Sequence, residues 1–315
     1  MIVSAPAIEA WQLQKSFGKT TALAPLDLVV PRGAIFALVG HNGAGKTTLI
    51  KLLLNMIQPT GGSSSVFGSS SATLKGPSFQ QIGYVSENQE MPEWMTVGGM
   101  MQFLRPFYPK WDEGSLLADL DLPADRKLKN LSRGMRMKAA LASVLAFRPP
   151  LIVMDEPFSG LDPLVRDELI ETLMDRISDE VESGDDGGTT ILISSHDLAE
   201  VESFATHVAF LHQGKLLFAE PMVTLTARFR DVTAMLPPAD AGKALPVGLP
   251  ASWLMAEANG SMVRFVYTGV GEASLEDELQ RVLPGATLVQ AELMTLRTIF
   301  LALVKSSRER ERSRA

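Results

Sequence analysis

A glycine-rich run near the start of the chain restricts its fold more than any other feature. Residues 40–47 read Gly-His-Asn-Gly-Ala-Gly-Lys-Thr, a complete G-x-x-x-x-G-K-[ST] phosphate-binding loop. The apolar run at 34–39 is typical of a buried strand, and residues 48–54 have a helical pattern. This strand–loop–helix order is the setting in which the motif binds phosphate. The sequence therefore predicts that a nucleoside triphosphate binds here.

The residue types of this loop have defined roles around a triphosphate. Glycines allow several backbone N–H groups to point at one anion beside a helix N-terminus. Lys46 is expected to reach the β- and γ-phosphates, and the Thr47 hydroxyl is expected to ligate Mg²⁺. The predicted nucleotide-binding residues of the loop are Gly40, Asn42, Gly43, Ala44, Gly45, Lys46, Thr47 and Thr48.

Two adjacent carboxylates follow a second apolar run, at residues 151–154. A buried strand that ends in carboxylates can place Asp155 near the Mg²⁺ ion and Glu156 beside the attacking water. An exposed acidic turn after a core strand is the competing interpretation, which the phosphate loop upstream disfavours. We predict that Asp155 binds the metal and that Glu156 is a catalytic residue.

The composition excludes several other kinds of site. The 315 residues contain no cysteine, which excludes disulfides, zinc–thiolate sites and cysteine nucleophiles and suits the cytosol. A net charge of −7 argues against broad electrostatic binding of nucleic acid. No apolar run approaches the roughly 18 residues of a membrane-spanning helix, and residues 1–6 lack the pattern of a signal peptide. We therefore expect a cytoplasmic chain that reaches a membrane only through a partner.

Short apolar runs alternate with helical patterns over the first two thirds of the chain. This alternation favours an α/β domain with a mainly parallel sheet. Strands are expected at residues 8–16, 22–30, 34–39, 151–154 and 190–193, with a helix at 164–181 and a turn-rich loop at 183–188. The first two strands are predicted to form a small antiparallel subdomain. A helical insertion is expected at about 90–148, with helices at 97–107, 114–120 and 136–147.

The pattern changes after Pro221. Strands are expected at 232–236, 252–256, 262–267 and 287–290, with helices at 273–283 and 292–305. The last helix carries an apolar stripe, predicted to be buried against the small sheet, of Leu293, Leu296, Phe300 and Leu303. The charged residues 308–314 are expected to form a frayed, solvated end. We predict a nucleotide-binding domain at 1–220 and a small α+β domain at 221–315.

Residues 131–135 read Leu-Ser-Arg-Gly-Met and open one of the predicted helices. Here the chain resembles the ATP-binding-cassette (ABC) ATPases, whose signature is usually L-S-G-G-Q. Arg133 and Met135 depart from that pattern, and the pair resembles variants found in some exporter cassettes. The motif stands one helix upstream of the two carboxylates, as in the family. The resemblance implies that Ser132 and Gly134 bind nucleotide, although a serine at a helix N-terminus is also an ordinary cap.

Two more motifs follow in the order that the family uses. The run Ser-Gly-Leu-Asp that ends at Asp162 resembles the D-loop, which crosses the dimer interface beside the nucleotide. The run Ser-Ser-His-Asp at 194–197 resembles the switch-histidine motif, which implies that His196 contacts the γ-phosphate. In isolation His196 would be read as a structural histidine, and its place in the ordered set favours the catalytic role.

Two positions carry substitutes for the family's usual residues. Phe17 stands where a tyrosine normally stacks on adenine, and stacking needs only the ring face; a core phenylalanine is the alternative. Glu87 replaces the glutamine that touches Mg²⁺ and the attacking water, which implies a catalytic and metal-binding role for Glu87. Its carboxylate retains a coordinating oxygen but adds negative charge near the nucleotide. Gln89 is the alternative for this role.

The resemblance covers about residues 8–220 and implies a composite site. ATP would lie between the phosphate loop of one subunit and the signature motif of another in a head-to-tail dimer, which we expect to be a homodimer. Closure completes the site and expels water before hydrolysis. The chain would power a membrane transporter of the exporter type, with separate transmembrane permease subunits, ATP and Mg²⁺. Apolar residues of the insertion would face the permease or form the insertion's own core; they are Met91, Trp94, Met95, Met100 and Met101.

Two other functions fit parts of the sequence. A soluble cassette protein acting on ribosomes or DNA would share the motifs, but such proteins generally carry two cassettes in one chain or long coiled-coil insertions. A P-loop kinase leaves the signature and switch motifs unexplained. The transported substrate and the direction of transport are properties of the permease.

Overall fold

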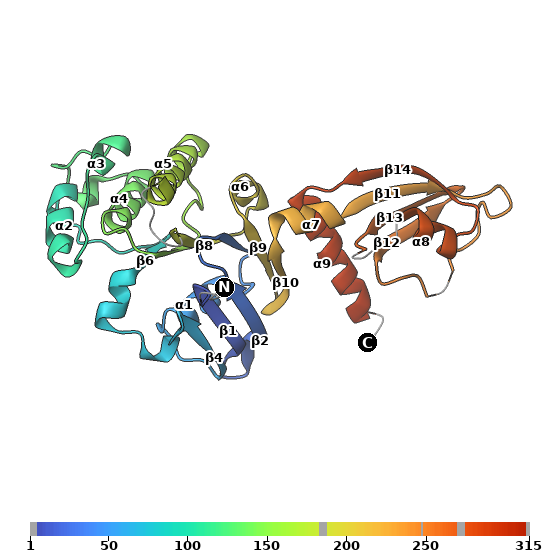
Figure 1. Cartoon of the computed structure of the whole chain (residues 1–315), viewed down its shortest axis with the longest axis horizontal. Helices are drawn as coiled ribbons and strands as arrows, with labels where there is room; N and C mark the ends of the chain where they lie inside the picture. The colour runs from blue at the N-terminus through green and yellow to red at the C-terminus, as the bar shows by residue number, and fades with distance from the viewer. Residues whose placement is uncertain (1–4, 183–187, 247, 270–274, 313–315) are drawn as a thin grey trace. The chain divides into compact units, whose positions relative to one another are not determined.

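The computed structural model describes residues 5–182, 188–246, 248–269 and 275–312. The chain divides into two compact units, Met1–Ala219 and Glu220–Ala315. Each unit has its own sheet or sheets and its own helices (Figure 1). The predicted loop at 183–188 falls mostly on residues 183–187, which lie outside the described residues.

The first unit is built on a six-stranded sheet in the order β10-β9-β3-β8-β7-β6. Its strands are β3 (Ile35–Val39), β6 (Ile82–Ser86), β7 (Leu151–Asp155), β8 (Thr190–Ser195), β9 (His207–His212) and β10 (Lys215–Pro221). The pairs from β9 through β3, β8 and β7 to β6 are parallel, which confirms the mainly parallel sheet. Strands β7 and β8 are buried along their whole length, because elements cover both faces of such a sheet.

A smaller antiparallel sheet carries the N-terminal strands in the order β2-β1-β4-β5. These are β1 (Ile8–Phe17), β2 (Thr20–Val30), β4 (Gly61–Val66) and β5 (Ser69–Ser70). Helix α1 (Lys46–Leu53) packs between the two sheets and contacts β1, β2, β4 and β7. Its buried Leu49, Ile50 and Leu53 belong to the core that joins them. The predicted antiparallel subdomain is confirmed. It also contains β4 and β5, which were not predicted because their serine-rich sequences lack the apolar pattern of a strand.

The insertion between β6 and β7 is helical, as predicted. It contains α2 (Val97–Leu104), the 3₁₀ turn η3 (Arg105–Phe107), α3 (Leu116–Asp119), η4 (Leu128–Asn130) and α4 (Arg133–Leu145), and further 3₁₀ turns precede β6 at η1 (Ser71–Thr73) and η2 (Gly76–Gln81). The Ser132 hydroxyl caps α4 by accepting a hydrogen bond from Met135 N at 3.2 Å, so this helix begins earlier than predicted. Helices α4 and α5 (Pro163–Glu182) lie across the sheet from α1, and α6 (Leu198–Glu202) follows β8 (Figure 1).

The second unit is a four-stranded antiparallel sheet in the order β12-β13-β11-β14. Its elements are α7 (Met222–Arg228), β11 (Arg230–Met235), β12 (Trp253–Asn259), β13 (Met262–Tyr267), α8 (Leu275–Val282), β14 (Thr287–Leu293) and α9 (Leu296–Arg312). Leu279 of α8 packs into the core formed by Val232 and Phe265 on one face of the sheet. The α+β architecture of this unit matches the prediction.

Two expectations for the end of the chain are wrong. Residues 291–293 continue β14, because they pair with β11, so the last helix begins at Leu296 instead of 292. Leu293 is consequently exposed, and the buried stripe of α9 contains Leu296, Ile299 and Phe300. Residues 308–312 of the predicted frayed end belong to α9, which extends to Arg312, since Arg and Glu are good helix formers; residues 313–314 lie outside the described residues.

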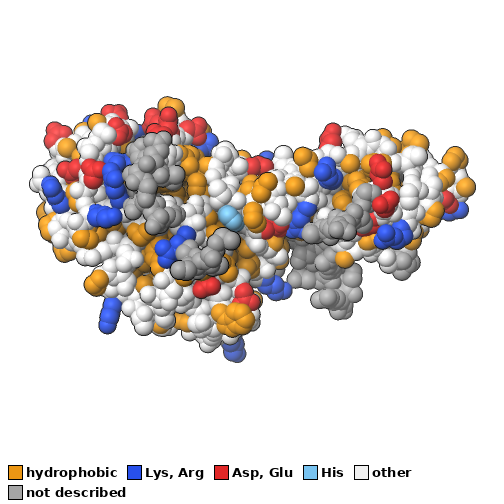
Figure 2. Space-filling model, in the orientation of Figure 1, with side chains coloured by type: hydrophobic (Ala, Val, Ile, Leu, Met, Phe, Trp, Pro, Cys, Tyr) orange, Lys and Arg blue, Asp and Glu red, His pale blue; other side chains and the backbone are white. Residues whose placement is uncertain are grey.

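No helix among the described residues has the length and apolar character needed to cross a membrane. The face drawn in Figure 2 mixes basic and acidic side chains; several acidic ones lie along the edge over α3 and α5, and others lie elsewhere on both units. The coloured part of this face therefore offers no broad basic surface of the kind that nucleic acid would need.

Candidate nucleotide-binding site

The backbone of the phosphate loop has room only for glycine at two points. A Cβ on Gly40 would lie 2.3 Å from the carbonyl oxygen of Leu211, so no side chain fits where β3 passes β9. Gly45 has φ +108° and forms the N-terminal cap of α1. Only glycine adopts such a conformation freely. These two residues turn the chain sharply from β3 into α1 and leave the helix N-terminus open to an anion.

An open pocket of about 710 Å³ lies over this helix N-terminus. Its walls are Thr20, Thr21, Ala22, Asn42, Gly43, Gly45, Lys46, Thr47, Thr48, Glu87, Glu156, Ser159, His196, Gln213 and Gly214. The pocket thus brings the phosphate loop together with three catalytic candidates that are far away in sequence, namely Glu87, Glu156 and His196. Thr20, Gln213 and their neighbours come from the β1–β2 hairpin and the turn after β9, where no motif marks them.

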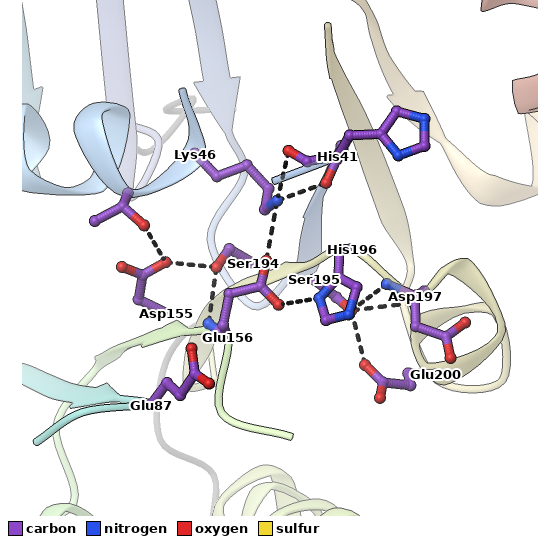
Figure 3. Close-up of polar contacts among 12 residues, drawn as sticks. His41, Lys46, Glu87, Asp155, Glu156, Ser194, Ser195, His196, Asp197 and Glu200 are labelled. Carbon is purple, nitrogen blue, oxygen red and sulfur yellow. Dashed lines mark hydrogen bonds and ion pairs between the residues drawn. The ribbon is translucent and has the colours of Figure 1, made fainter. Parts of the chain in front are cut away.

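The Glu156 carboxylate lies between the side chains of Lys46 and His196 (Figure 3). Its Oε1 atom is 2.9 Å from Lys46 Nζ, and its Oε2 atom is 2.7 Å from His196 Nδ1. Lys46 also donates to the carbonyl oxygens of Gly40 and His41. Lys46 is 5% exposed, so its charge acts where water screens little. The lysine, the carboxylate and the imidazole therefore form one connected polar cluster.

Asp155 ends β7 beside the helix that follows the phosphate loop. Its Oδ1 atom accepts hydrogen bonds from the Thr47 hydroxyl at 3.2 Å and from the Ser194 hydroxyl at 2.7 Å. Ser194 in turn accepts from the backbone N–H of Glu156 at 2.9 Å. This serine is directly opposite Asp155 in the β7–β8 register. Ser194 therefore fixes the positions of both carboxylate residues, a role that the motif around His196 did not predict.

The backbone of Glu156 has φ +52°, in the left-handed region that is uncommon outside glycine. Non-glycine residues in this region persist where surrounding contacts fix them, and they concentrate at functional sites. At Glu156 the fixing contact is the Ser194 hydrogen bond to its N–H. The turn directs the Glu156 side chain toward Lys46 and His196 (Figure 3).

Two groups near the pocket have shifted pKa values. Burial raises the pKa of Glu200 above its usual range, although this carboxylate accepts a hydrogen bond from the Ser195 hydroxyl at 2.7 Å. Burial, with a further contribution from the charge of Asp155, raises the pKa of Tyr84. Tyr84 therefore stays neutral at physiological pH and adds no charge beneath the metal-binding candidate.

Glu87 follows β6 and lies on the wall of the pocket. Its Oε1 atom is 2.5 Å from the Arg133 guanidinium at the start of α4. Gln89, the alternative for the same role, accepts a hydrogen bond from Ser86 N. The structure thus places Glu87 at the phosphate pocket, where one of its carboxylate oxygens is paired with Arg133 of the signature motif.

Several predicted site residues lie outside the walls of the pocket. Phe17 is 52% exposed at the end of β1, with Lys15 Nζ 5.0 Å from its ring centroid. Ser132 and Gly134 lie at the start of α4, and Asp162 accepts a hydrogen bond from Leu164 N at the start of α5. Gly40 and Ala44 lie on the core side of the loop. Gly40 is beside the backbone of Leu211 and the side chain of Ala44, and Ala44 is buried.

The parallel sheet, the glycine loop after β3 and the carboxylates at the end of β7 define a P-loop nucleoside triphosphatase. Residues 23–159 match the family described as "ABC transporter". The bacitracin transport ATP-binding protein BcrA of Enterococcus faecalis is 31% identical over 238 residues, which are 74% of this chain and 75% of that protein. The lantibiotic transport ATP-binding protein SrtF of Streptococcus pyogenes is 32% identical over 65% of this chain and 86% of its own length.

Solved structures agree with these relatives. An ATP-binding subunit of an ABC transporter shares 27% identity over 70% of this chain and 92% of its own, with a TM-score of 0.63. A dimeric ATP-binding cassette bound to ADP and Pi shares the fold, with a TM-score of 0.58 and 21% identity over 68% of this chain and 98% of its own. The chain belongs to the ABC transporter family, as an ATP-binding subunit that hydrolyses ATP.

Ser194→Ala is expected to lower the ATPase rate by about tenfold, because the N–H of Glu156 and the Asp155 carboxylate lose a shared buried partner worth about 1–3 kcal/mol. Steady-state phosphate release checks this result. Ser143→Ala is the matched control, since that buried hydroxyl donates to the helix carbonyl of Ala140 and does not line the pocket. An equal loss of rate in both variants would contradict the role of Ser194.

Proposed function

We propose that this chain is the motor subunit of an exporter, and that its predicted site residues act as the ABC resemblance implies. The observation that carries the proposal is the cluster of Lys46, Glu156 and His196 in the phosphate pocket. Phosphoryl transfer to water is favoured by such a cluster, in which a carboxylate lies between a cationic group and an imidazole.

Lys46 is proposed to bind the β- and γ-phosphates, which compete with Glu156 for its ammonium group. Displaced from Lys46, the Glu156 carboxylate accepts a proton from the water that attacks the γ-phosphate. The hydrogen bond from His196 orients this carboxylate, and His196 in turn contacts the γ-phosphate. Both partners of Glu156 therefore tie its position to the presence of nucleotide.

Mg²⁺ fits the oxygen atoms that meet beside the loop. The Thr47 hydroxyl and the Asp155 carboxylate are joined by one hydrogen bond, and both are oxygen donors of the type that Mg²⁺ prefers. Glu87, which also lines the pocket, offers a third oxygen. When bound, the ion would neutralise charge on the β- and γ-phosphate oxygens.

The site residues outside the pocket walls fit roles in a dimer. Ser132, Gly134 and Asp162 start two neighbouring helices, α4 and α5, and so offer backbone N–H groups to an anion brought by a second copy. Phe17 presents an exposed ring for stacking on adenine at the pocket's hairpin side. We therefore propose a head-to-tail homodimer with one ATP at each interface, built from the domain at 1–220.

The permease is proposed to be a separate transmembrane chain, which keeps this subunit on the cytoplasmic face of the membrane. The helical insertion supplies the contact surface. Met100 and Met101, two of the predicted partner-facing residues, are buried in the insertion's own core, whereas Trp94 is 72% exposed. Phe103 and Phe107 add two exposed rings with centroids 5.6 Å apart. Exposed aromatic groups of this kind mark protein interfaces.

Trp94→Ala is expected to reduce permease-stimulated ATP hydrolysis by about tenfold and to leave the affinity of the free subunit for ATP unchanged, because a large interface aromatic is typically worth 2 kcal/mol or more. Reconstitution with a candidate permease, a multi-spanning protein sought among the neighbouring reading frames, measures the stimulation. Trp11→Ala is the matched control, since Trp11 is 70% exposed on the antiparallel sheet. Equal stimulation in the Trp94 and Trp11 variants would rule out this docking surface.

The same reconstitution tests the proposed function as a whole. Stimulated hydrolysis and ATP-driven movement of a compound across the vesicle membrane support an exporter. The named transport relatives of this chain handle bacitracin and a lantibiotic, so peptide antibiotics are the first compounds to try. Salt-sensitive binding of RNA or DNA without stimulation by the membrane protein would favour a cassette that acts on ribosomes or DNA.

A further inference from the structure

The two family departures at Glu87 and Arg133 contact each other. Glu87 stands where the family carries glutamine, and Arg133 stands where the signature motif carries glycine. Their side chains form an ion pair at 2.5 Å across 46 residues of sequence. The pair joins the end of β6 to the first residue of α4. A neutral glutamine and a glycine at these positions cannot form this connection, so the two substitutions function together.

The ion pair lies between two functional surfaces of the subunit. Glu87 lines the phosphate pocket, and both residues line a neighbouring groove of about 480 Å³ beside the insertion. On its other side Arg133 approaches the D-loop, where a Cβ on Gly160 would lie 2.8 Å from the guanidinium. The Arg133 side chain is 52% exposed and the Glu87 side chain 32%. Arg133 is thus held at the surface that carries Ser132, Gly134 and Asp162.

We propose that Arg133 is a latched phosphate-binding residue. In the subunit without nucleotide, Glu87 holds the guanidinium on its own subunit. When ATP and its Mg²⁺ enter the pocket that Glu87 lines, this carboxylate exchanges Arg133 for the metal ion, to which it is proposed to offer an oxygen, and the ion pair weakens. Arg133 then turns to the phosphates of the nucleotide held by a second copy of the chain. The inference rests on the head-to-tail dimer of the proposed function.

Electrostatics favours this exchange of partners. An ion pair exposed to this degree contributes little stability, because water screens it. A triphosphate carries several negative charges, against one on Glu87, and a guanidinium binds phosphate oxygens with two parallel hydrogen bonds. The positive end of the 13-residue helix α4 adds to the attraction, since Arg133 is its first residue. A signature motif with glycine at this position has no such cation.

Dimerisation induced by the non-hydrolysable analogue AMP-PNP tests the proposal without relying on activity. Sedimentation of the full chain should show a dimer dissociation constant about tenfold higher in Arg133→Ala, because one charged contact with phosphate is lost. Glu87→Gln should lower the constant by about threefold, since Arg133 is released in advance. In the Arg133→Ala background, Glu87→Gln should have no further effect. Arg133→Lys should recover part of the loss.

The outcomes separate this proposal from the function on which it rests. Calorimetric titration of AMP-PNP at protein concentrations below dimerisation should give equal affinity for wild type and Arg133→Ala, because Arg133 acts on the other subunit's nucleotide. Unchanged dimerisation in Arg133→Ala, or the same effect of Glu87→Gln with and without Arg133, would overturn the latch alone. A wild-type chain that binds AMP-PNP but stays monomeric would overturn both the proposed dimer and the latch.

Discussion

Glu156→Gln is expected to reduce kcat for ATP hydrolysis by about 10³-fold while ATP binds with equal or higher affinity. The amide keeps the size of the side chain and one oxygen that accepts from Lys46, but it cannot accept a proton from water. Removal of one negative charge beside the triphosphate site also favours the nucleotide. Single-turnover hydrolysis and calorimetric titration of ATP measure the two quantities separately.

A second carboxylate close to the site serves as the control. Glu200 is hydrogen-bonded to Ser195 and does not line the pocket. Glu200→Gln should keep the rate within about threefold of wild type, because a general base must contact the reacting water. Unchanged steady-state hydrolysis in Glu156→Gln would refute the catalytic assignment of Glu156, whatever the control variant does.

The core of the site was predictable because its signals are local. One signal is the spacing of Gly40, Gly45 and Lys46 within a single short loop. The other is the pair Asp155 and Glu156 directly after an apolar run. In a parallel sheet, the carboxyl ends of neighbouring strands lie at one edge, so residues at both strand ends meet there. Only β8 lies between β3 and β7 in the sheet, so this rule places Thr47 and Asp155 at the same edge, and the structure adds the hydrogen bond that joins them.

Contacts between distant segments were not predictable in the same way. Ser194 became a partner of Asp155 through the register of β7 against β8, and no spacing within either strand encodes that register. The Glu87–Arg133 ion pair joins two motifs on either side of the helical insertion. The sequence shows that each residue departs from the family pattern, and only the three-dimensional structure shows that the two residues contact each other.

The end of the chain shows a different kind of failure. Leu293, Leu296, Phe300 and Leu303 match helical spacing, and three of them do lie in α9. Leu293 belongs to β14, because pairing of residues 291–293 with β11 outweighed the apolar period in the sequence. Apolar spacing therefore located the helix correctly but misplaced its start, since the boundary is decided by hydrogen bonds to a strand about 60 residues earlier in the chain.

Lys46→Ala is expected to weaken ATP binding by about 100-fold, because a hydrogen-bonded charge contributes about 1.5–3 kcal/mol and this one lies in a nearly buried position. The ammonium group contacts two loop carbonyls and the Glu156 carboxylate, and no other lysine or arginine lines the pocket among the described residues. Its loss leaves Glu156 without its cationic partner, so the local charge becomes more repulsive toward a triphosphate. Calorimetry of ATP binding measures the effect.

Lys51→Ala separates loss of this contact from a general loss of positive charge. Lys51 lies in the last turn of the same helix, is exposed, and does not line the pocket. The Lys51→Ala variant should have an affinity for ATP within about twofold of wild type, because a solvated charge one turn or more away from the phosphates is largely screened. Thermal melting of both variants checks that the fold is retained. Equal ATP affinity in wild type and Lys46→Ala would mean that the glycine loop does not hold the phosphates, and the roles assigned to Asp155, Glu156 and His196 around it would fail with it.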